Sequence, residues 1–308
     1  MGTADLACAS LDALLQAPSI EVVAVVTQPD KPRGRDLRLQ PPAVKQLALS
    51  HNRPVLQPTR AREESFLAQL QSLRPELIVV AAYGQILPQA ILDLPGLGCL
   101  NVHTSLLPKY RGAAPIQWAI LDGETETGVT IMKMDAGLDT GDILAREKIS
   151  IGPDETSAAL HDRLAQLGAK LLLATIPRWA AGEITPEKQP NTGVSYARKV
   201  TREDARLDWS QPARALHNRI RAFTPWPGAF TFQQAEGKPR LLKICQAAVA
   251  PDFSGPPGKI LEAGKDGIIV ACGTGALRIL RLQREGGRPL NSHEFLTGTR
   301  LHPSEQLG

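Results

Sequence analysis

An amide and an imidazole lie two residues apart in the segment Asn101-Val102-His103. This segment follows the apolar run 97–100, so it forms the end of a predicted strand. Side chains two apart on a strand point to the same face, so Asn101 and His103 project together while Leu100 and Val102 point into the core. An amide can donate a hydrogen bond to a developing oxyanion, and an imidazole can move a proton near neutral pH. The pair is therefore suited to polarising a carbonyl group.

Asn-x-His alone is a weak signal, because most such pairs simply end a strand and bond to the backbone. The segments that follow make the signal specific: Ser105-Leu106-Leu107-Pro108, Arg111-Gly112-Ala113-Ala114-Pro115-Ile116-Gln117 and Met134-Asp135-Ala136-Gly137-Leu138-Asp139-Thr140-Gly141-Asp142. Together these motifs resemble the folate-dependent formyltransferases. The resemblance runs over nearly the whole chain, from Gly2-Thr3 to the last strands, and is looser beyond residue 230.

The resemblance implies formyl transfer from 10-formyltetrahydrofolate to the α-amino group of methionyl initiator tRNA. The product would be N-formylmethionyl-tRNA, for translation initiation. In this family's pattern Asn101 holds the oxyanion, and His103 stabilises that charge and donates a proton. Asp139 matches the catalytic aspartate, which would orient His103 and help relay the proton lost by the amine. The scheme needs no covalent enzyme intermediate, and no metal site is expected.

Two other acids stand close to Asp139 in the same motif. Asp135 is suited to capping a turn, and Asp142 to a charge at the edge of a strand. For both, these structural roles are favoured over catalysis, and the Leu-Asp-Thr-Gly context favours Asp139.

The co-substrate site follows from the resemblance as well. Ser105, Leu106, Leu107 and Pro108 match the family's folate-contacting loop, whose main-chain groups would line a pterin pocket with the two leucines as apolar walls. Tyr83 and Gly84, within the segment 82–87, are expected on its other side. Without the neighbouring motif, Ser-Leu-Leu-Pro would be interpreted as ordinary loop packing.

The segment 28–38 is long for a connection between a strand and a helix. It carries two anions and four cations, the cations being Lys31, Arg33, Arg35 and Arg38. Cations on a protruding loop can contact phosphates. The resemblance implies that this loop contacts the tRNA, with Arg35 at the key basic position. A plain solvated surface is the alternative. From Arg202 onward the chain has 15 Lys or Arg against 10 Asp or Glu, which is compatible with a polyanionic partner.

These residues need a scaffold, and the first half of the chain alternates strand and helix patterns. Strands are expected at 20–26, 77–82, 98–103, 130–134 and 143–149, and helices at 3–15, 42–49, 62–73 and 156–179. Alternation of this kind predicts an α/β fold with a doubly wound, mostly parallel sheet. Ligands bind beyond the carboxyl ends of such strands, where segments 83–84 and 101–108 lie.

The pattern then fades into Pro, Gly, Asn and Lys. We interpret 1–182 as the folate-binding catalytic domain, 183–201 as a linker and 202–308 as a tRNA-binding domain. The last domain is expected to hold a helix at 211–222 and five short strands at 227–233, 240–247, 258–262, 267–272 and 276–283. Five strands suit a small OB-like β-barrel, a reading that the resemblance favours, and a generic β-sandwich fragment is the alternative.

The first strand of the doubly wound sheet is missing from the sequence. A Gly turn is present at Gly2-Thr3, but the apolar strand that should precede it is not. That strand is usually central, and its absence would leave two neighbours with unpaired backbone groups. The expectation is that the start of the chain has been misassigned or trimmed. A direct pairing of strands 20–26 and 77–82 would refute it.

Composition sets broad limits. The chain has 308 residues, of which 43% are hydrophobic and 21% charged, and these values are typical of a soluble globular protein. No apolar run is long enough to span a bilayer, and no export signal is seen at the start. The four cysteines are scattered singly, which suits a reducing cytoplasm. A monomer is expected, with Trp118, Trp209 and Trp226 as packing residues.

Three alternatives remain open at this point. Asn101, His103 and Asp139 would also serve a formyltransferase acting on another amine, such as a purine precursor or an amino sugar nucleotide. They would equally serve a formylfolate hydrolase. A non-catalytic RNA-binding relative is the third alternative, and the intact set of polar residues argues against it.

Overall fold

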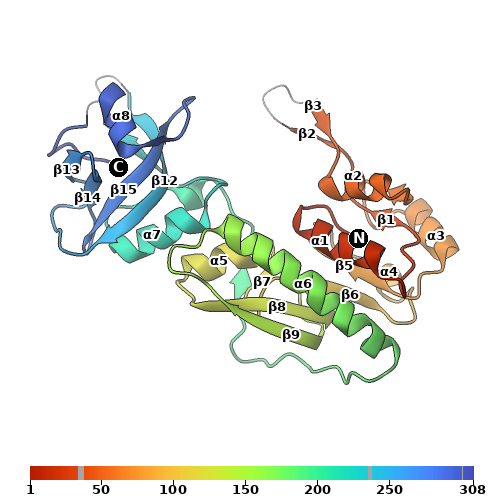
Figure 1. Cartoon of the computed structure of the whole chain (residues 1–308). Helices are drawn as coiled ribbons and strands as arrows, with labels where there is room; N and C mark the ends of the chain where they lie inside the picture. The colour runs from red at the N-terminus through yellow and green to blue at the C-terminus, as the bar shows by residue number, and fades with distance from the viewer. Residues whose placement is uncertain (34–37, 235–237, 300) are drawn as a thin grey trace. The chain divides into compact units, whose positions relative to one another are not determined.

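The computed structural model describes residues 1–33, 38–234, 238–299 and 301–308. It contains two compact units (Figure 1). The first unit comprises Met1–Pro115, Glu126–Ser150 and His161–Arg198. The second comprises Ile116–Thr125, Ile151–Leu160 and Lys199–Gly308. Two short segments from the first half of the chain therefore belong to the second unit.

The first unit is built on a mixed sheet. Parallel pairs join β1 (Val25–Val26) to β4 (Val55–Leu56), and β5 (Ile78–Val80) to β6 (Cys99–His103). From β6 onward the order continues antiparallel through β8 (Glu126–Lys133) and β9 (Asp142–Ser150). The sheet expected to be mostly parallel is thus half antiparallel: β8 runs antiparallel to β6, and β9 returns antiparallel to β8. The predicted strand 20–26 is paired only at 25–26, since its partner β4 has two residues.

The first two residues lie between β1 and β5, which do not pair with each other in the described sheets. Gly2 N donates to Val26 O at 2.9 Å, and Ala81 N donates to Met1 O at 2.9 Å. The Met1 amine donates to Val79 O at 2.6 Å. Val26 on one side of the gap, and Val79 and Ala81 on the other, are therefore bonded to Met1 or Gly2.

Helices cover the sheet of the first unit (Figure 1). They are α1 (Leu6–Gln16), α2 (Ala43–Ser50), α3 (Glu64–Leu73), α4 (Gln89–Leu92) and α6 (Ser157–Ala180). Gly168 lets α6 approach the sheet closely, because a Cβ there would lie 2.8 Å from the Val102 side chain and 3.6 Å from Val129. This packing fixes β6, which carries Asn101 and His103.

The segment 28–38, expected as a loop, contains part of a β-ribbon. Its strands β2 (Lys31–Arg33) and β3 (Arg38–Gln40) pair antiparallel. The ribbon leads into α2 (Figure 1). Charged residues hide these strands from sequence reasoning, because a single apolar pair, Pro32 with Leu39, lies between two pairs of charged or polar residues in the described register.

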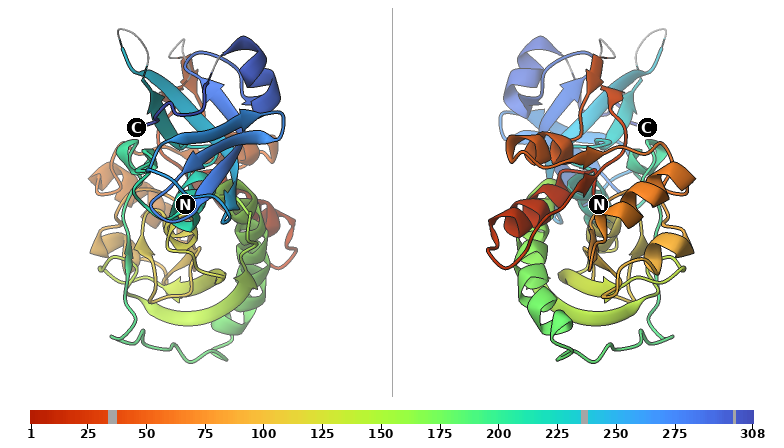
Figure 2. Two further views of the ribbon diagram at one scale, coloured as in Figure 1. Left: turned by 90° about the vertical axis from the view of Figure 1, so that its left-hand side faces the viewer. Right: turned by 90° about the vertical axis from the view of Figure 1, so that its right-hand side faces the viewer.

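Much of the stretch expected as a linker is bound to the first unit. After α6 the chain passes the β8–β9 hairpin (Figure 2), and Glu187 forms an antiparallel bridge with Ile143. Farther on, β10 (Tyr196–Ala197) pairs in parallel with β7 (Arg111–Gly112). A Cβ on Gly112 would lie 2.7 Å from Ala197 O, so the two backbones meet where only glycine fits.

The second unit holds an antiparallel sheet in the order β11-β12-β15-β14-β13. Its strands are β11 (Phe230–Gln233), β12 (Arg240–Ala250), β13 (Ile260–Gly264), β14 (Gly267–Ala271) and β15 (Ala276–Arg284), with β16 (Leu290–Asn291) beside β15. Within the described residues, the edge strands β11 and β13 do not pair with each other. Instead the last residues bridge both edges, through Gln233–Leu307 and Lys259–Gln306.

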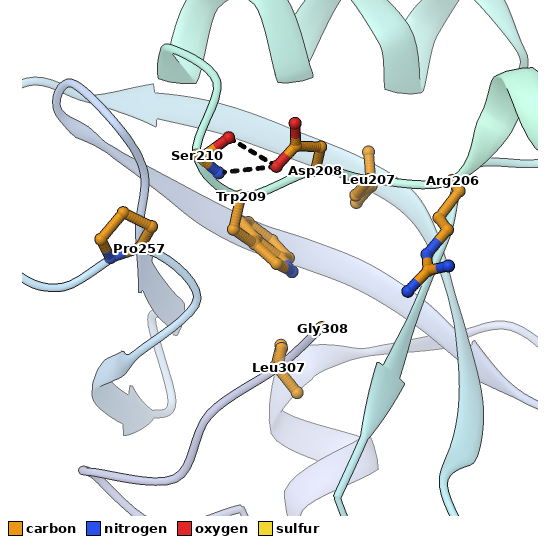
Figure 3. A pocket seen from close by; sticks show the side chains of 8 residues that line it. All are labelled: Arg206, Leu207, Asp208, Trp209, Ser210, Pro257, Leu307 and Gly308. Carbon is orange, nitrogen blue, oxygen red and sulfur yellow. Dashed lines mark hydrogen bonds between the residues drawn. The ribbon is translucent and has the colours of Figure 1, made fainter.

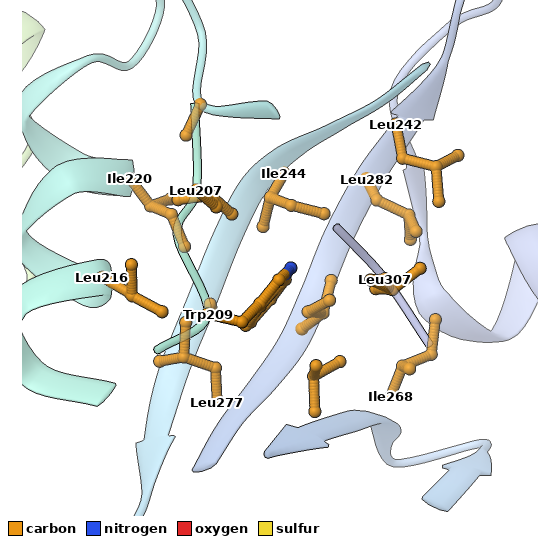
Figure 4. Packing of buried hydrophobic residues seen from close by; sticks show 14 of the residues in the cluster. Leu207, Trp209, Leu216, Ile220, Leu242, Ile244, Ile268, Leu277, Leu282 and Leu307 are labelled. Carbon is orange, nitrogen blue, oxygen red and sulfur yellow. The ribbon is translucent and has the colours of Figure 1, made fainter. Parts of the chain in front are cut away.

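Helices complete the second unit: α5 (Pro115–Leu121), α7 (Ala213–Ala222), α8 (Ser292–Gly298) and the 3₁₀ turn Glu203–Ala205. Leu216 and Ile220 of α7 pack with Ile244 and Leu282 of the sheet around Trp209 (Figure 4). Trp209 Nε1 donates to Thr231 Oγ1 at 2.9 Å. The burial of Trp209 confirms its prediction as a packing residue.

Candidate active site

The structure brings together the three side chains that sequence analysis selected. Asn101 Nδ2 donates to Asp139 Oδ1 at 3.3 Å, and His103 Nδ1 lies 3.7 Å from Asp139 Oδ2. Asn101 and His103 project from β6 as the strand alternation predicts, and Asp139 comes from the loop between β8 and β9. His103 is 5% exposed, and Leu100 and Val102 are buried. An amide, an imidazole and a carboxylate therefore converge on one face of the carboxyl-terminal half of β6.

Asp139 is held in an uncommon backbone conformation. Its φ is +51°, a region that costs a non-glycine residue energy unless its surroundings hold it. Gly112 N donates to Asp139 Oδ2 at 2.8 Å, which fixes the carboxylate. The other acids act as expected: Asp135 Oδ1 accepts from Gly137 N and Thr140 Oγ1, and Asp142 begins β9.

The proton on His103 can be placed from its neighbours. His103 Nε2 lies 2.9 Å from Tyr110 O, a carbonyl that can only accept a hydrogen bond. Nε2 therefore carries a proton in either charge state. In the neutral ring Nδ1 bears the lone pair, on the side of Asp139. Nδ1 is thus the ring nitrogen with a lone pair to offer, and it faces a carboxylate.

The Ser105–Pro108 segment is fixed from beneath by Thr130. Thr130 Oγ1 donates to Ser105 O at 2.7 Å and accepts from Leu107 N at 3.2 Å. Ser105 is fully buried, and its hydroxyl donates to Lys109 O. Leu107 is 1% exposed and packs against Met132 and Ile143, whereas Leu106 is half-buried. The main chain and Leu106 are therefore the parts of this segment best able to face a ligand.

Tyr83 and Gly84 follow β5. The Tyr83 side chain is 2% exposed, and burial, with a smaller effect of Glu63, raises its pKa to about 12. Tyr83 O accepts hydrogen bonds from Thr3 Oγ1 and Gln28 Nε2, both at 2.9 Å. Gly84 has φ +79°. This segment therefore presents backbone rather than the tyrosine ring, and Ile86 beyond it is 85% exposed.

Three of the four predicted tRNA-binding cations lie on the strands of the β-ribbon. Lys31 is exposed on β2 and donates to Gln28 Oε1. Arg33 ends β2 and Arg38 begins β3. Arg35 lies outside the described residues.

The prediction that Trp226 is a packing residue is wrong, since its side chain is 60% exposed.

Sequence analysis missed four groups that touch the site. Gly112 N and Tyr110 O hold Asp139 and His103, and Thr130 holds the Ser105–Pro108 segment. Gln189 Nε2 donates to Asp139 O at 2.8 Å. Gly112 lies within a motif that was recognised, and strand pairing places Thr130 opposite His103. No sequence signal marks Gln189.

Two pockets lie away from this site and share no residue with it. One of about 450 Å³ is in the second unit (Figure 3), lined by Arg206, Leu207, Asp208, Trp209, Ser210, Pro257, Leu307 and Gly308. The other, of about 520 Å³, lies between β9 and α6.

Among the described residues, no group of three or more His, Cys, Asp or Glu side chains could hold a metal ion. No described helix has the length and apolarity needed to cross a membrane.

Family models match both halves of the chain: formyl transferase over residues 1–176, and formyl transferase C-terminal domain over 199–300. With a fold and a site of this kind, the chain belongs to the formyl transferase family. It is a one-carbon transferase by that membership.

Among curated relatives, the methionyl-tRNA formyltransferase of Geobacter metallireducens is 51% identical over 308 residues, covering 100% of this chain and 97% of its own. That of Myxococcus xanthus is 51% identical over 306 residues, covering 99% and 96%.

Solved structures share the fold at lower identity. The N-formyltransferase of Helicobacter canadensis, in complex with folinic acid and dTDP-3-aminofucose, has a TM-score of 0.64 at 20% identity, covering 94% of this chain and 97% of that one. HypX of Aquifex aeolicus, in complex with tetrahydrofolic acid, has a TM-score of 0.58 at 21% identity, covering 84% and 45%.

Proposed function

We propose that this chain transfers the formyl group of 10-formyltetrahydrofolate to the α-amino group of methionyl initiator tRNA. The observation that carries the proposal is the convergence of Asn101, His103 and Asp139 within hydrogen-bonding or ion-pairing reach of one another. Identity near 50% over the full length of methionyl-tRNA formyltransferases supports the choice of acceptor. The role in translation initiation argues for the cytoplasm.

The residues of the site suit the co-substrate. 10-Formyltetrahydrofolate would supply an electrophilic formyl carbon. The main chain of Ser105–Pro108 and of Tyr83–Gly84 offers polar groups for a pterin, and exposed apolar side chains accompany them: Ile86 is 85% exposed and Leu138 57%. Aromatic rings edged by polar atoms bind to surfaces of this mixed character.

Each catalytic residue then has one task. Asn101 Nδ2 donates a hydrogen bond to the formyl oxygen as it gains negative charge. His103 Nδ1 takes the proton that the attacking amine loses and delivers it to the departing nitrogen. Asp139 keeps the imidazole in place and faces the positive charge on Nδ1. The bond from the amine to the formyl carbon forms first and gives a tetrahedral oxyanion. Its collapse breaks the bond to the folate nitrogen, which takes the proton from His103 and leaves as tetrahydrofolate.

We assign tRNA binding to the cations of segment 28–38, which are Lys31, Arg33, Arg35 and Arg38, and to the region 202–308. The net positive charge of residues 202–308 and the four cations of segment 28–38 support this assignment. The antiparallel sheet of the second unit also supports it, because such a sheet is compatible with an OB-like barrel, a fold that commonly binds nucleic acids. Residues 1–182 would carry catalysis, and 183–201 would connect the two parts.

A panel of acceptors tests the function. The purified chain is incubated with 10-formyltetrahydrofolate and methionyl initiator tRNA, a dTDP-amino sugar, a purine-pathway amine, or no acceptor. Of these acceptors, only methionyl initiator tRNA should become formylated, so that formylmethionine accumulates. Faster formylation of another amine, or release of formate without any acceptor, would contradict the proposal.

Arg35→Ala tests the assignment of the ribbon. Loss of a phosphate contact should lower kcat/KM for the tRNA, weaken its salt dependence and leave the KM for the folate unchanged. The matched control is Arg62→Ala, which removes one exposed positive charge elsewhere in the first unit. Equal kinetics for the two variants, with the parental response to salt, would remove Arg35 from the interface.

A further inference from the structure

Gln189 makes four hydrogen bonds beside the candidate active site. Its Nε2 donates to Asp139 O and to Gly141 O, both at 2.8 Å. Its Oε1 accepts from Arg111 Nε at 3.1 Å and from Arg111 Nη2 at 2.7 Å. Arg111 has only donors and the two carbonyls only accept, so the orientation of the amide is fixed. Glutamine is the side chain whose donors and acceptor match this arrangement.

The loop that carries Asp139 has reason to need such support. Asp139 has φ +51°, so its backbone is held in a sparsely populated region. The Asp139 side chain is also occupied by Gly112 N and Asn101 Nδ2. Gln189 instead bonds the backbone on both sides of Thr140, at the C-terminal end of the loop. A shift of this backbone would carry the carboxylate away from His103.

Gln189 is itself anchored on both sides along the chain. Two residues before it, Glu187 exchanges backbone hydrogen bonds with Ile143 at 2.8 and 2.9 Å. After it, β10 pairs with β7, where Arg111 N donates to Ser195 O at 2.9 Å. The segment 187–197 therefore lies against the site as an ordered part of the first unit.

We propose that Gln189 is a positioning residue of the transferase: it acts on catalysis through Asp139 and touches no substrate. The inference rests on the proposed role of Asp139. The segment 187–197 then does more than connect two parts of the chain, because it supplies the bonds that keep the Asp139 loop in its reactive conformation.

Gln189→Glu is the sharpest variant. It retains the contact with Arg111 but turns an oxygen toward the Asp139 and Gly141 carbonyls, so two attractive contacts become repulsive. We expect kcat to fall at least about tenfold, with both KM values changed less than about threefold. Gln189→Met, of similar size and without charge, should give the same pattern. Glu187→Gln is the matched control: it removes the Arg146 ion pair from the same segment and should retain parental kcat.

A double variant separates positioning from general stability. If Gln189 acts through Asp139, then Asp139→Asn with Gln189→Glu should turn over no more slowly than Asp139→Asn alone, measured in single turnovers with excess enzyme. Losses that multiply, or parental kcat in both Gln189 variants, would overturn the inference. Parental kcat in Asp139→Asn alone would reject the proposed role of Asp139, and this inference with it.

Discussion

Asn101 has a long hydrogen bond in this structure. Its Nδ2 lies 3.3 Å from Asp139 Oδ1, whereas an amide donating to a carboxylate is usually closer to about 2.9 Å. A weak bond costs little to exchange for a shorter one to a developing oxyanion. The geometry thus fits a donor that bonds more strongly in the transition state than in the ground state, as catalysis requires.

Asn101→Ala should therefore lower kcat by about 10²- to 10³-fold while changing the KM for either substrate little, because the lost bond forms chiefly in the transition state. Steady-state kinetics with methionyl-tRNA measure this directly. A raised KM with parental kcat would mean that Asn101 binds the ground state instead.

Individual site residues can be predicted from sequence only where a local pattern marks them. Strand alternation predicts that Asn101 and His103 share a face, because the two-residue period is a local property. Asp139 is predicted only through the family resemblance. It lies in a loop 36 positions after His103, and no periodicity indicates where such a residue is placed. Gln189 could not be predicted at all: two of its partners are backbone carbonyls, which leave no trace in the sequence, and the third, Arg111, lies 78 positions away.

Among the elements, the pairing of β7 with β10 depends on Gly112. Gly112 has φ +119°, its N–H holds Asp139, and a Cβ there would lie 2.7 Å from Ala197 O. One short strand, β7, thus connects the loop that carries Asp139 to the segment after α6.

Gly112→Ala should separate β7 from β10 and displace the amide that holds Asp139. We expect at least about a tenfold loss of kcat, and a lower urea midpoint. Gly182→Ala is the control: its φ is +72°, but no atom lies within 4 Å of the added Cβ. If both variants behave alike, backbone strain rather than the close approach explains the result.

Elements with many apolar positions are predicted well from sequence. The helices expected at 156–179 and 211–222 occur as α6 and α7, and the five strands after residue 226 all occur. The two-residue strands β4, β7 and β10 escape prediction, because pairing with distant backbone creates them rather than their own residues. The ribbon of β2 and β3 escapes for a different reason: its described strands have three residues each, and most of these are charged or polar.

At the scale of the whole molecule, the second unit includes segments that precede it in sequence. Arg221 of α7 donates to Gly152 O at 3.2 Å and to Glu155 O at 3.3 Å, and Ser157 Oγ donates to Thr224 O at 2.9 Å. His217 Nε2 lies 3.2 Å from Asp154 Oδ1. These contacts attach residues 151–160 to α7 and the residues just after it. The sequence does not predict this, because no change in composition marks 151–160 as part of the second unit.

His217 gives the second unit a predictable response to pH. Burial lowers its pKa and outweighs the opposing attraction of Asp154, and Arg221 and Arg214 act with burial. A histidine with a lowered folded pKa binds protons more readily when unfolded. Stability should therefore be complete above about pH 6.5 and fall as the pH drops from there toward the folded pKa.

Urea unfolding at about pH 8 and about pH 5.5 tests this against His217→Gln, which cannot titrate. The loss of unfolding free energy between the two pH values should be smaller in the variant. An equal loss in both proteins would show that other groups cause the acid sensitivity.

In the proposed reaction His103, set between Asn101 and Asp139, moves the proton during formyl transfer. The most direct measurement is the single-turnover rate of methionyl-tRNA formylation by His103→Ala, with the tRNA dissociation constant measured on the same preparation. The account predicts a rate at least about 10²-fold below the parent with unchanged tRNA affinity. A parental rate, or a loss explained wholly by weaker tRNA binding, would contradict it.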